Sequence, residues 1–358
     1  MALHFHKLTV KDVRQETGDC VSIALDIPRE LGENFRFKQG QNITVKCTLN
    51  GVEVRRSYSI CSSPLDNELR IAVKKVYGGA FSSFANQKLN KGDVLEVLPP
   101  TGTFYTDVHI SNKKDYVFFA AGSGITPVIS IIKTILPVEP ESSVTLVFGN
   151  RNVSSIIFKE QLEALKDKYL QRFSMHHILS RERTEADINY GRIDSKKCLQ
   201  FSKLIDFASA DEFFICGPEE MIFAVKEFLE TNRIQKHKIH FELFTTPARK
   251  VTKFDPAPKK TEDGGSEVTV KLDGRSFNFT LDYNSSTILD AALSLGADLP
   301  FSCKGGVCTT CKAKLIEGKV DMEVNYGLEP DEVEAGFILT CQSHPGSKKV
   351  VIDFDVKS

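Results

Sequence analysis

Four cysteines near the C-terminus constrain this chain more than any other feature. Three of them lie in the stretch CKGGVCTTC, which runs from Cys303 to Cys311, and the fourth is Cys341. The spacing is therefore C-x4-C-x2-C, followed by 29 residues and a further cysteine. Zinc sites usually take their ligands as two short cysteine pairs, and a thioredoxin-type redox pair needs no third or fourth cysteine. A zinc site and a chance grouping of thiols stay open as alternatives, but neither explains this spacing.

The spacing is that of plant-type proteins that bind a [2Fe–2S] cluster through four thiolates. Such a loop turns tightly and directs backbone N–H groups at sulfur, which Gly305 and Gly306 permit. The stretch LDAALSLGADLPFSCKGGVCTTCKAKLIEGKVDM, followed by GFILTCQSHP, resembles the plant-type ferredoxin family over about 90 residues. This resemblance implies a β-grasp fold and one-electron transfer. It also implies four iron ligands, Cys303, Cys308, Cys311 and Cys341.

The rest of the 358-residue chain predicts further domains. Residues 1–110 alternate short strands with turns, including the hairpin signal Asn50-Gly51, and predict a small antiparallel β-barrel. Residues 111–247 alternate strands with helices, one of them expected over 156–169, and predict a parallel sheet covered on both faces. Residues 248–266 read as a linker, and 267–358 as a compact α+β module. We therefore expect a multidomain protein with an antiparallel barrel, an α/β Rossmann-like domain and an α+β domain.

The charge balance gives little reason to expect a nucleic-acid partner, because the formal net charge is −1. From Glu267 onward, however, 14 acidic residues face 9 lysines and arginines, a net charge of −5 that suits charge-guided docking. No apolar run is long enough for a membrane span, and the N-terminus lacks a signal-peptide pattern. We expect a soluble cytoplasmic protein with no membrane partner, in which the five other cysteines are free thiols.

A flavin site is indicated by RRSYSICSS, in which Arg56, Ser57, Tyr58 and Ser59 resemble the R-x-Y-S signature of the ferredoxin–NADP reductase family. Taken alone, this pattern could be an ordinary strand, but VKKVYGGAFSS resembles the second flavin segment of the same family. The resemblance implies that Arg56 pairs with the pyrophosphate of FAD, a task suited to guanidinium, with Tyr58 on the flavin ring and Ser59 near its reactive nitrogen. The second segment supplies Val73, Lys74, Gly78, Gly79 and Ser82. FAD is favoured over FMN by the GGAFS stretch.

A dinucleotide site is indicated by FFAAGSGITPVISII, where a glycine turn follows a strand and opens a helix. Such a turn brings backbone N–H groups close to a pyrophosphate. It is not the general G-x-G-x-x-G fingerprint, but it resembles the version in the ferredoxin–NADP reductase family, and a plain tight turn is the alternative. The residues that carry this resemblance are Gly122, Gly124, Ile125, Thr126 and Pro127.

Residues at the ends of later strands complete the expected nucleotide site, because ligands bind at the carboxyl ends of parallel strands. Ser180 and Arg181 resemble the pair that binds the adenosine 2′-phosphate in NADP-using members of the family, and they favour NADPH over NADH. Arg151 is a candidate for a further contact with this phosphate. The family resemblance places the CGP turn, Cys216, Gly217 and Pro218, near the nicotinamide, and Glu242 of HFELF near the flavin. Cys216 could also be a buried strand-end residue, and Glu242 a salt-bridged carboxylate. The candidate catalytic residues are Ser59, Cys216 and Glu242.

Together these segments predict one electron path, from NADPH through FAD and a [2Fe–2S] cluster to an outside acceptor. The stretch from Gly149 to Glu182 and the cysteine loop resemble the family of reductase subunits that serve phenylacetyl-CoA epoxidases. That resemblance implies a di-iron oxygenase component as partner. We expect the partner to dock on the residues around the cysteine loop, including Lys304, Val307 and Thr309. Reductases of other hydroxylases, of demethylating oxygenases or of desaturases remain alternatives. Two further alternatives are a stand-alone NAD(P)H diaphorase and a non-enzymatic electron-transfer module.

Overall fold

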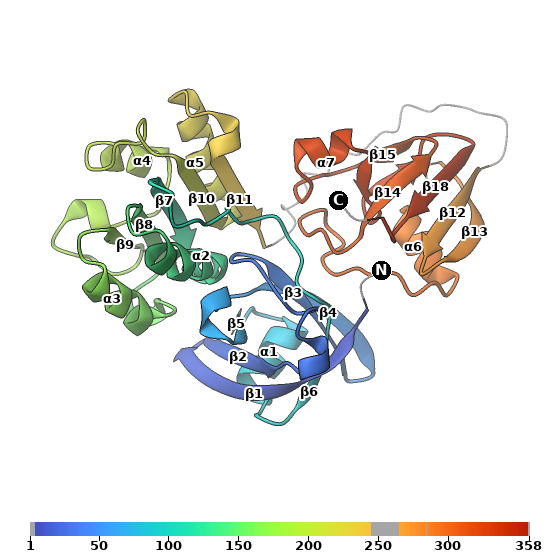
Figure 1. The fold of residues 1–358 in the computed structure, drawn as a ribbon, viewed down its shortest axis with the longest axis horizontal. Coiled ribbons are helices and arrows are strands. Elements are labelled where there is room, and N and C mark those ends of the chain that lie inside the picture. Colours follow the sequence, from blue (N-terminus) through green and yellow to red (C-terminus); the bar gives the residue numbers. More distant parts are fainter. Residues whose placement is uncertain (1–3, 245–264, 284, 357–358) are drawn as a thin grey trace. The chain divides into compact units, whose positions relative to one another are not determined.

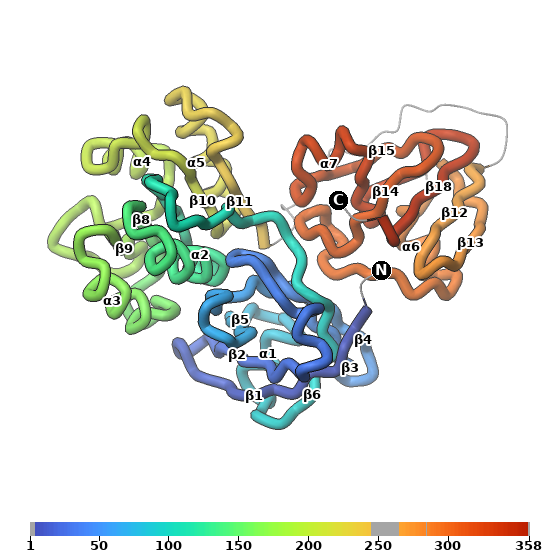
Figure 2. The backbone as a smooth tube through the Cα atoms, in the orientation of Figure 1, coloured from blue at the N-terminus to red at the C-terminus, as the bar shows by residue number. Residues whose placement is uncertain are grey.

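The computed structural model describes residues 4–244, 265–283 and 285–356 (Figure 1). The chain builds its sheets one after another from consecutive stretches of sequence, as the colours of Figure 2 show. A larger compact unit is formed by His6–Val54 and Tyr58–Phe244, and a smaller one holds the C-terminal part of the chain. Each unit is described by itself.

The first sheet has six strands in the order β4-β3-β6-β1-β2-β5. The pairs β1–β2, β1–β6, β2–β5 and β3–β6 run antiparallel. The sheet closes on itself, because Ile60, just beyond β4, forms a bridge with Ile71 of β5. The predicted barrel is confirmed. Its elements are β1 (His6–Thr17), β2 (Cys20–Asp26), β3 (Asn42–Leu49), β4 (Val52–Ser59), β5 (Leu69–Lys74), β6 (Val94–Val97), α1 (Ala80–Gln87) and the short helices η1 (Arg29–Leu31) and η2 (Pro64–Asp66).

The second sheet is parallel, with five strands in the order β11-β10-β7-β8-β9. The order reverses between β7 and β10, and a ligand crevice forms beyond the strand ends at such a switch point. The predicted Rossmann-like domain is confirmed. Its strands are β7 (Asp115–Ala121), β8 (Ser143–Asn150), β9 (Phe173–Leu179), β10 (Glu212–Gly217) and β11 (Ile239–Leu243). Its helices are α2 (Ile125–Val138), α3 (Lys159–Lys168), α4 (Ser195–Phe201), α5 (Glu219–Thr231), η3 (Gly122–Gly124), η4 (Val153–Ser155), η5 (Asp187–Asn189) and η6 (Lys236–Lys238).

The barrel and the parallel sheet belong to the same compact unit and are joined by buried polar contacts. Ser130 of α2 donates a 2.6 Å hydrogen bond to the carbonyl of Ser62, and the Oγ of Ser63 lies 2.8 Å from Oγ1 of Thr134. Gly40 allows this close packing, because a Cβ there would lie 3.1 Å from Cδ1 of Ile131 in α2. The join places the end of β4 beside the carboxyl edge of the parallel sheet.

The C-terminal unit contains a mixed five-stranded sheet in the order β13-β12-β18-β14-β16 and a separate pair, β15-β17. Its core contains Val268, Val270 and Ile352 from strands and Ile288 and Ala292 from α6. The predicted α+β domain is confirmed. Its elements are β12 (Ser266–Leu272), β13 (Arg275–Leu281), α6 (Ile288–Ser294), β14 (Lys312–Glu317), β15 (Val320–Met322), α7 (Pro330–Glu334), β16 (Phe337–Leu339), β17 (Ser343–Pro345) and β18 (Lys349–Asp353).

The expected linker, residues 248–266, falls mostly outside the described residues. Its last residue, Ser266, already begins β12, where it pairs with Leu281 of β13. The β12 strand therefore starts one residue earlier than the sequence pattern indicated.

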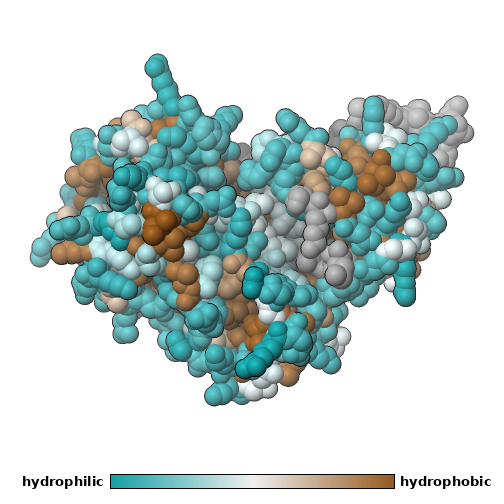
Figure 3. All heavy atoms as spheres, viewed as in Figure 1, coloured by the Kyte–Doolittle hydropathy of each residue, from teal (hydrophilic) through white to brown (hydrophobic). Residues whose placement is uncertain are grey.

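The face of the molecule drawn in Figure 3 is mostly hydrophilic, and its hydrophobic residues form separate patches. Within the described part of the chain, every helix is too short or too polar to cross a bilayer.

Candidate flavin, nucleotide and iron–sulfur sites

The three predicted catalytic residues come together at the carboxyl edge of the parallel sheet. Ser59 ends β4, and its Oγ donates a 2.9 Å hydrogen bond to Oε2 of Glu242. Glu242 lies on β11 directly beside Cys216 of β10 in the parallel register. The hydroxyl of Ser59 therefore lies next to the carboxyl group of Glu242, and Glu242 is the neighbour of Cys216 in the sheet. Their catalytic role stays a prediction.

Burial sets the protonation of this group. It raises the pKa of Glu242 to about 7, against the opposing effect of hydrogen bonds from Ser59 and Asn42. Near neutral pH the carboxyl group can therefore hold or release a proton beside Ser59. Burial and the nearby Glu242 also raise the pKa of the Cys216 thiol well above its usual value near 9. That thiol stays protonated at neutral pH and is not a nucleophile.

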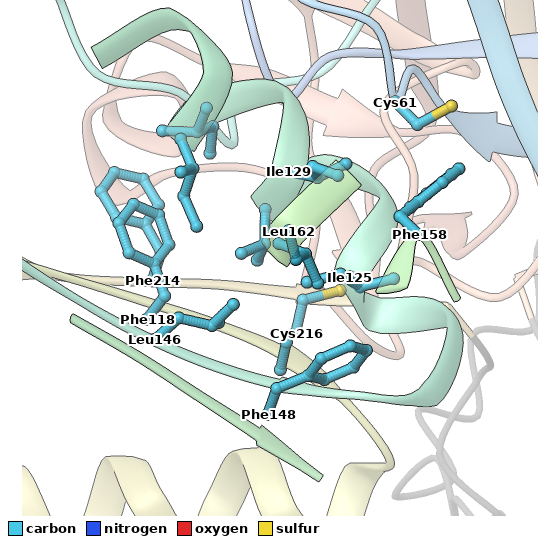
Figure 4. Close-up of a cluster of buried hydrophobic side chains, with 14 of the residues drawn as sticks. Cys61, Phe118, Ile125, Ile129, Leu146, Phe148, Phe158, Leu162, Phe214 and Cys216 are labelled. Atoms are coloured by element: carbon cyan, nitrogen blue, oxygen red, sulfur yellow. The ribbon is translucent and has the colours of Figure 1, made fainter. Parts of the chain in front are cut away.

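The side chain of Cys216 is fully buried and belongs to the core cluster that also contains Ile125 and Phe148 (Figure 4). Its carbonyl oxygen, by contrast, faces the glycine turn after β7. A packing role for the thiol is therefore evident, and its predicted place beside the nicotinamide stays a prediction.

The residues of the R-x-Y-S motif follow one another along β4. Arg56 is exposed, and its Nη1 donates a 2.7 Å hydrogen bond to the carbonyl of Arg55. Tyr58 is half-buried, and the centroid of its ring lies 5.4 Å from the ring centroid of Phe81 in α1. An exposed guanidinium has the charge and the donors that a pyrophosphate requires. Ser57, next to Tyr58, is partly exposed.

The second flavin segment forms a glycine turn at the start of α1. Gly78 has a φ of +71°, and Gly79 is the N-cap residue. The Oγ of Ser82 accepts a 3.1 Å hydrogen bond from the N–H of Val76, so this hydroxyl fixes the turn. A Cβ on Gly79 would lie 2.4 Å from that Oγ. The turn fits a phosphate, because it needs glycine and presents a helix N-terminus.

Val73 and Lys74 end β5 close to the nucleotide turn. The carbonyl of Val73 accepts a 3.0 Å hydrogen bond from Nδ2 of Asn86. The Nζ of Lys74 lies 3.7 Å from a carboxylate oxygen of Asp19 and 3.9 Å from where a Cβ on Gly122 would be. The predicted flavin and nucleotide segments are therefore neighbours in space.

The glycine turn between β7 and α2 meets the CGP turn at the switch point of the sheet. Gly122 has a φ of +54°. A Cβ on Gly124 would lie 2.0 Å from the carbonyl oxygen of Cys216, and one on Gly217 would lie 3.2 Å from the N–H nitrogen of Ala121. Only glycine lets the two turns approach this closely. The structure thus brings together two motifs that are more than ninety residues apart in the sequence.

The remaining residues of these two motifs form the starts of the helices that follow the turns. Ile125, Thr126 and Pro127 are buried in the first turn of α2, and Oγ1 of Thr126 donates a 3.0 Å hydrogen bond to the carbonyl of Ser123. Pro218 is the N-cap residue of α5, whose first turn contains two glutamates, Glu219 and Glu220. Acidic side chains there disfavour an anion, so α2 offers the better phosphate site.

The three residues expected to bind the 2′-phosphate lie at the carboxyl ends of β8 and β9. The N–H of Arg181 donates a 2.8 Å hydrogen bond to the carbonyl of Arg151, and the N–H of Ser180 donates a 2.9 Å bond to that of Asn150. Both arginine side chains are exposed. This group is separate from Cys216 and Glu242, which lie on the other side of β7 in the sheet order.

The four cysteines of the C-terminal unit come together although Cys341 is distant in sequence. The sulfur atoms of Cys303 and Cys308 are 3.1 Å apart. Hydrogen bonds with Cys308 and Cys341 lower the pKa of Cys303, and hydrogen bonds with Cys303 and Cys311 raise that of Cys341. Contacts therefore link the four sulfur atoms in series, from Cys308 to Cys303, from Cys303 to Cys341 and from Cys341 to Cys311.

The backbone around these thiols is shaped by glycine and by Gln342. The N–H of Gly305 donates a 3.3 Å hydrogen bond to the sulfur of Cys303. Gly306 has a φ of +73°, and a Cβ there would lie 3.1 Å from Cγ of Gln342. The amide nitrogen of Gln342 in turn lies 3.0 Å from the carbonyl of Lys304 and 3.7 Å from the sulfur of Cys341. This buried amide ties the cysteine loop to the fourth cysteine.

These residues match the ligand set of a two-iron cluster. A [2Fe–2S] cluster needs two thiolates on each iron, four in all. Four cysteine sulfur atoms linked by contacts, with a backbone N–H directed at one of them, meet that requirement.

The sequence reasoning missed three polar residues at these sites. They are Asn42 beside Glu242, Gln342 at the cysteines and Asn150 at the end of β8. Gln342 and Asn150 each lie one or two residues from a motif or strand end that was recognised. Proximity in sequence was the only available signal, because the contacts of these side chains depend on the fold.

Three family descriptions match successive parts of the chain. They are an oxidoreductase FAD-binding domain at residues 7–105, an oxidoreductase NAD-binding domain at 118–227 and a 2Fe-2S iron–sulfur cluster binding domain at 270–346. The chain belongs to the ferredoxin–NADP reductase-like oxygenase reductases with a C-terminal plant-type [2Fe–2S] domain. It is an oxidoreductase that uses FAD, a pyridine nucleotide and a [2Fe–2S] cluster.

Similar proteins include a subunit of the 1,2-phenylacetyl-CoA epoxidase from Escherichia coli strain K12, which is 45% identical over 99% of this chain and 98% of its own length. The ferredoxin reductase component of 3-ketosteroid-9-alpha-monooxygenase from Rhodococcus rhodochrous is 35% identical over 97% and 96%. Among solved structures, phthalate dioxygenase reductase covers 98% of both chains with a TM-score of 0.59 and 24% identity. The structural likeness concerns the fold alone.

Proposed function

We propose that this protein carries electrons from NADPH through FAD and a [2Fe–2S] cluster to the di-iron oxygenase component of a phenylacetyl-CoA epoxidase. The observation that carries the proposal is the 45% identity with the epoxidase component of Escherichia coli, which extends over nearly all of both chains. The 35% identity with the steroid monooxygenase component is lower over the same domains. An epoxidase partner is therefore favoured over a steroid oxygenase.

In this proposal each group of residues has one task. Arg56, with the glycine turn of α1, binds the flavin pyrophosphate, and the turn at the start of α2 binds the nucleotide pyrophosphate. Ser59 and Glu242 hold a proton beside the flavin. Cys303, Cys308, Cys311 and Cys341 are the iron ligands. When bound, FAD accepts a hydride and releases electrons singly, and the cluster carries them one at a time.

A preference for NADPH over NADH is supported by Arg151 and Arg181. Their backbones are hydrogen-bonded to each other, so both exposed guanidinium groups start from the same edge of the sheet. Two cations with several N–H donors suit a phosphate group, which NADPH has and NADH lacks. A ribose 2′-hydroxyl would call for an acidic residue instead.

The cytoplasm is the proposed location. None of the nine cysteines, all of them among the described residues, forms a disulfide bond. Cysteines in such number stay reduced in a reducing compartment, where NADPH is also available.

A reconstitution experiment tests the proposed partner. The purified protein is mixed with the oxygenase component of Escherichia coli phenylacetyl-CoA epoxidase, NADPH and phenylacetyl-CoA. Both NADPH oxidation and the coenzyme A ester product are measured. We expect NADPH oxidation that depends on phenylacetyl-CoA, with product formed.

The matched control replaces this component with the oxygenase component of 3-ketosteroid-9-alpha-monooxygenase and its own substrate. Equal or faster turnover with the steroid oxygenase would show that the partner is wrong. Reduction of small dyes without turnover of either oxygenase would indicate a stand-alone diaphorase.

A further inference from the structure

Asn150 has a buried side-chain amide whose polar atoms lack a hydrogen-bond partner among the described residues. It is the last residue of β8, and 8% of its surface is exposed. Among the described residues, neither its Oδ1 nor its Nδ2 has a hydrogen-bond partner. Burying polar atoms without partners destabilises the folded chain. A native structure that bears this cost calls for an explanation, and a bound ligand is one.

The position of Asn150 is defined by the sheet. In the register of β7 and β8, Gly149 lies beside Ala121, the last residue before the glycine turn. In that of β8 and β9, Asn150 lies beside Leu179, directly before Ser180 and Arg181. Asn150 therefore stands on the carboxyl edge between the predicted pyrophosphate turn and the predicted 2′-phosphate residues.

The side chain of Asn150 belongs to the face of the sheet that α2 covers. A Cβ on Gly149 would meet Ile193, which precedes α4, on the opposite face. Successive residues of a strand point to opposite faces. Phe148, two residues before Asn150, packs in the same core cluster as Ile125 of α2 (Figure 4). The amide thus lies on the side where the first turn of α2 begins.

We propose that the amide of Asn150 hydrogen-bonds the ribose of the adenosine half of the dinucleotide. This inference rests on the nucleotide site of the proposed function. The strand order places nicotinamide-side residues on β10, the pyrophosphate turn after β7 and the 2′-phosphate residues at β9. The end of β8 lies between the last two, where a dinucleotide has its adenosine ribose. A neutral amide both donates to and accepts from hydroxyl groups and does not repel the phosphates.

Two substitutions separate binding from folding. Asn150→Leu keeps a similar shape but removes the unpartnered amide, so the nucleotide-free protein should melt at an unchanged or higher temperature. Its Kd for NADP⁺ should nevertheless rise about tenfold, the effect of one or two lost hydrogen bonds. Asn150→Asp keeps the shape but adds a negative charge beside phosphates, and its Kd should rise further. Asn232→Leu, at an exposed amide in the C-cap of α5, is the control and should leave the Kd unchanged.

The measurements use the full chain with its flavin and cluster bound. Thermal melting is recorded with and without NADP⁺, and Kd values are measured by calorimetry for NADP⁺ and for 2′-phospho-ADP-ribose, which keeps the 2′-phosphate but lacks the nicotinamide. A loss of affinity for both ligands, with kcat for ferricyanide reduction nearly unchanged, is the expected result. Kd values within twofold of the wild type in both variants would overturn the inference, as would a loss confined to NADP⁺.

Failure of the inference differs from failure of the proposed function. If the wild-type protein neither binds NADP⁺ nor is reduced by NADPH, the proposed function is wrong. If the wild type binds normally and the two variants bind equally well, Asn150 has a structural role only, and the proposed function stands.

Discussion

Glu242 is the residue whose acid–base chemistry the fold changes most. Its pKa is about 7 in the folded chain, against an ordinary value near 4.5. The folded protein therefore binds this proton more tightly than the unfolded chain does. The associated stability is fully present below about pH 4.5 and is lost as pH rises through about 7. The shift corresponds to about 3 kcal/mol.

Glu242→Gln should remove this pH dependence. The glutamine side chain cannot ionise, yet its carbonyl can still accept the hydrogen bond from Ser59. Relative to the wild type, the variant should gain stability between pH 5 and 8, by up to about 3 kcal/mol. Urea unfolding followed by circular dichroism at several pH values measures the difference. Glu227→Gln, at an exposed position of α5, serves as the control. Parallel curves for wild type and Glu242→Gln would show that the carboxyl group is not protonated by burial.

Arg181→Ala should change the choice of nucleotide. Loss of a guanidinium that contacts the 2′-phosphate should raise KM for NADPH at least tenfold and leave KM for NADH nearly unchanged. Steady-state ferricyanide reduction with each nucleotide measures both. Arg192→Ala, at an 80% exposed arginine on the same domain, should alter neither value. Equal increases for the two nucleotides would mean that Arg181 does not contact that phosphate.

Site residues within short motifs could be predicted from sequence, and residues defined only by the fold could not. The cysteine spacing and the R-x-Y-S run identified their sites, because several ligands lie within a few residues of each other. Asn150 and Gln342 gave no such signal. The partners of Gln342 lie at Lys304 and Cys341, and the importance of Asn150 comes from its lack of a partner among the described residues.

At the scale of elements, the site depends on how closely β10 and the turn after β7 approach. Gly124→Ala would place a methyl group 2.0 Å from the carbonyl oxygen of Cys216, so one of the two turns has to move. We expect KM for NADPH to rise at least tenfold and the melting temperature to fall by several degrees, as for a small overpacking defect.

Gly18→Ala is the matched control for this substitution, because a Cβ there meets no atom within 4 Å. Steady-state kinetics and thermal melting of both variants measure the effect. Normal kinetics in Gly124→Ala would show that the nucleotide does not use this turn.

Element types were predictable where hydrophobic periodicity was strong, and their ends were less so. The helix expected over 156–169 begins at Lys159, because Phe158 has a φ of +59°, outside the helical region. The periodicity did not reveal α4, which has seven residues and is capped by the side chain of Asp194. Closure of the barrel through Ile60 and Ile71 is a long-range pairing that no local pattern encodes.

At the scale of the whole molecule, the flavin and cluster sites lie in different parts of the chain. Cys308→Ser should abolish the visible absorbance of the cluster and its electron paramagnetic resonance (EPR) signal, while NADPH still bleaches the flavin. Absorbance and EPR spectra before and after NADPH addition measure both. Cys47→Ser, at a half-buried thiol of β3, should leave both cofactors intact. Loss of flavin reduction together with the cluster would contradict independent sites.

Electrons should follow a single path from nucleotide through flavin to cluster, and anaerobic reduction of the wild-type protein is the sharpest test of that path. NADPH is added under argon while flavin absorbance is followed, and samples are frozen for EPR. We expect the flavin to bleach and a reduced-cluster signal then to appear, approaching one spin per chain. A flavin that bleaches while the cluster stays oxidised under excess NADPH would rule out electron transfer from flavin to cluster.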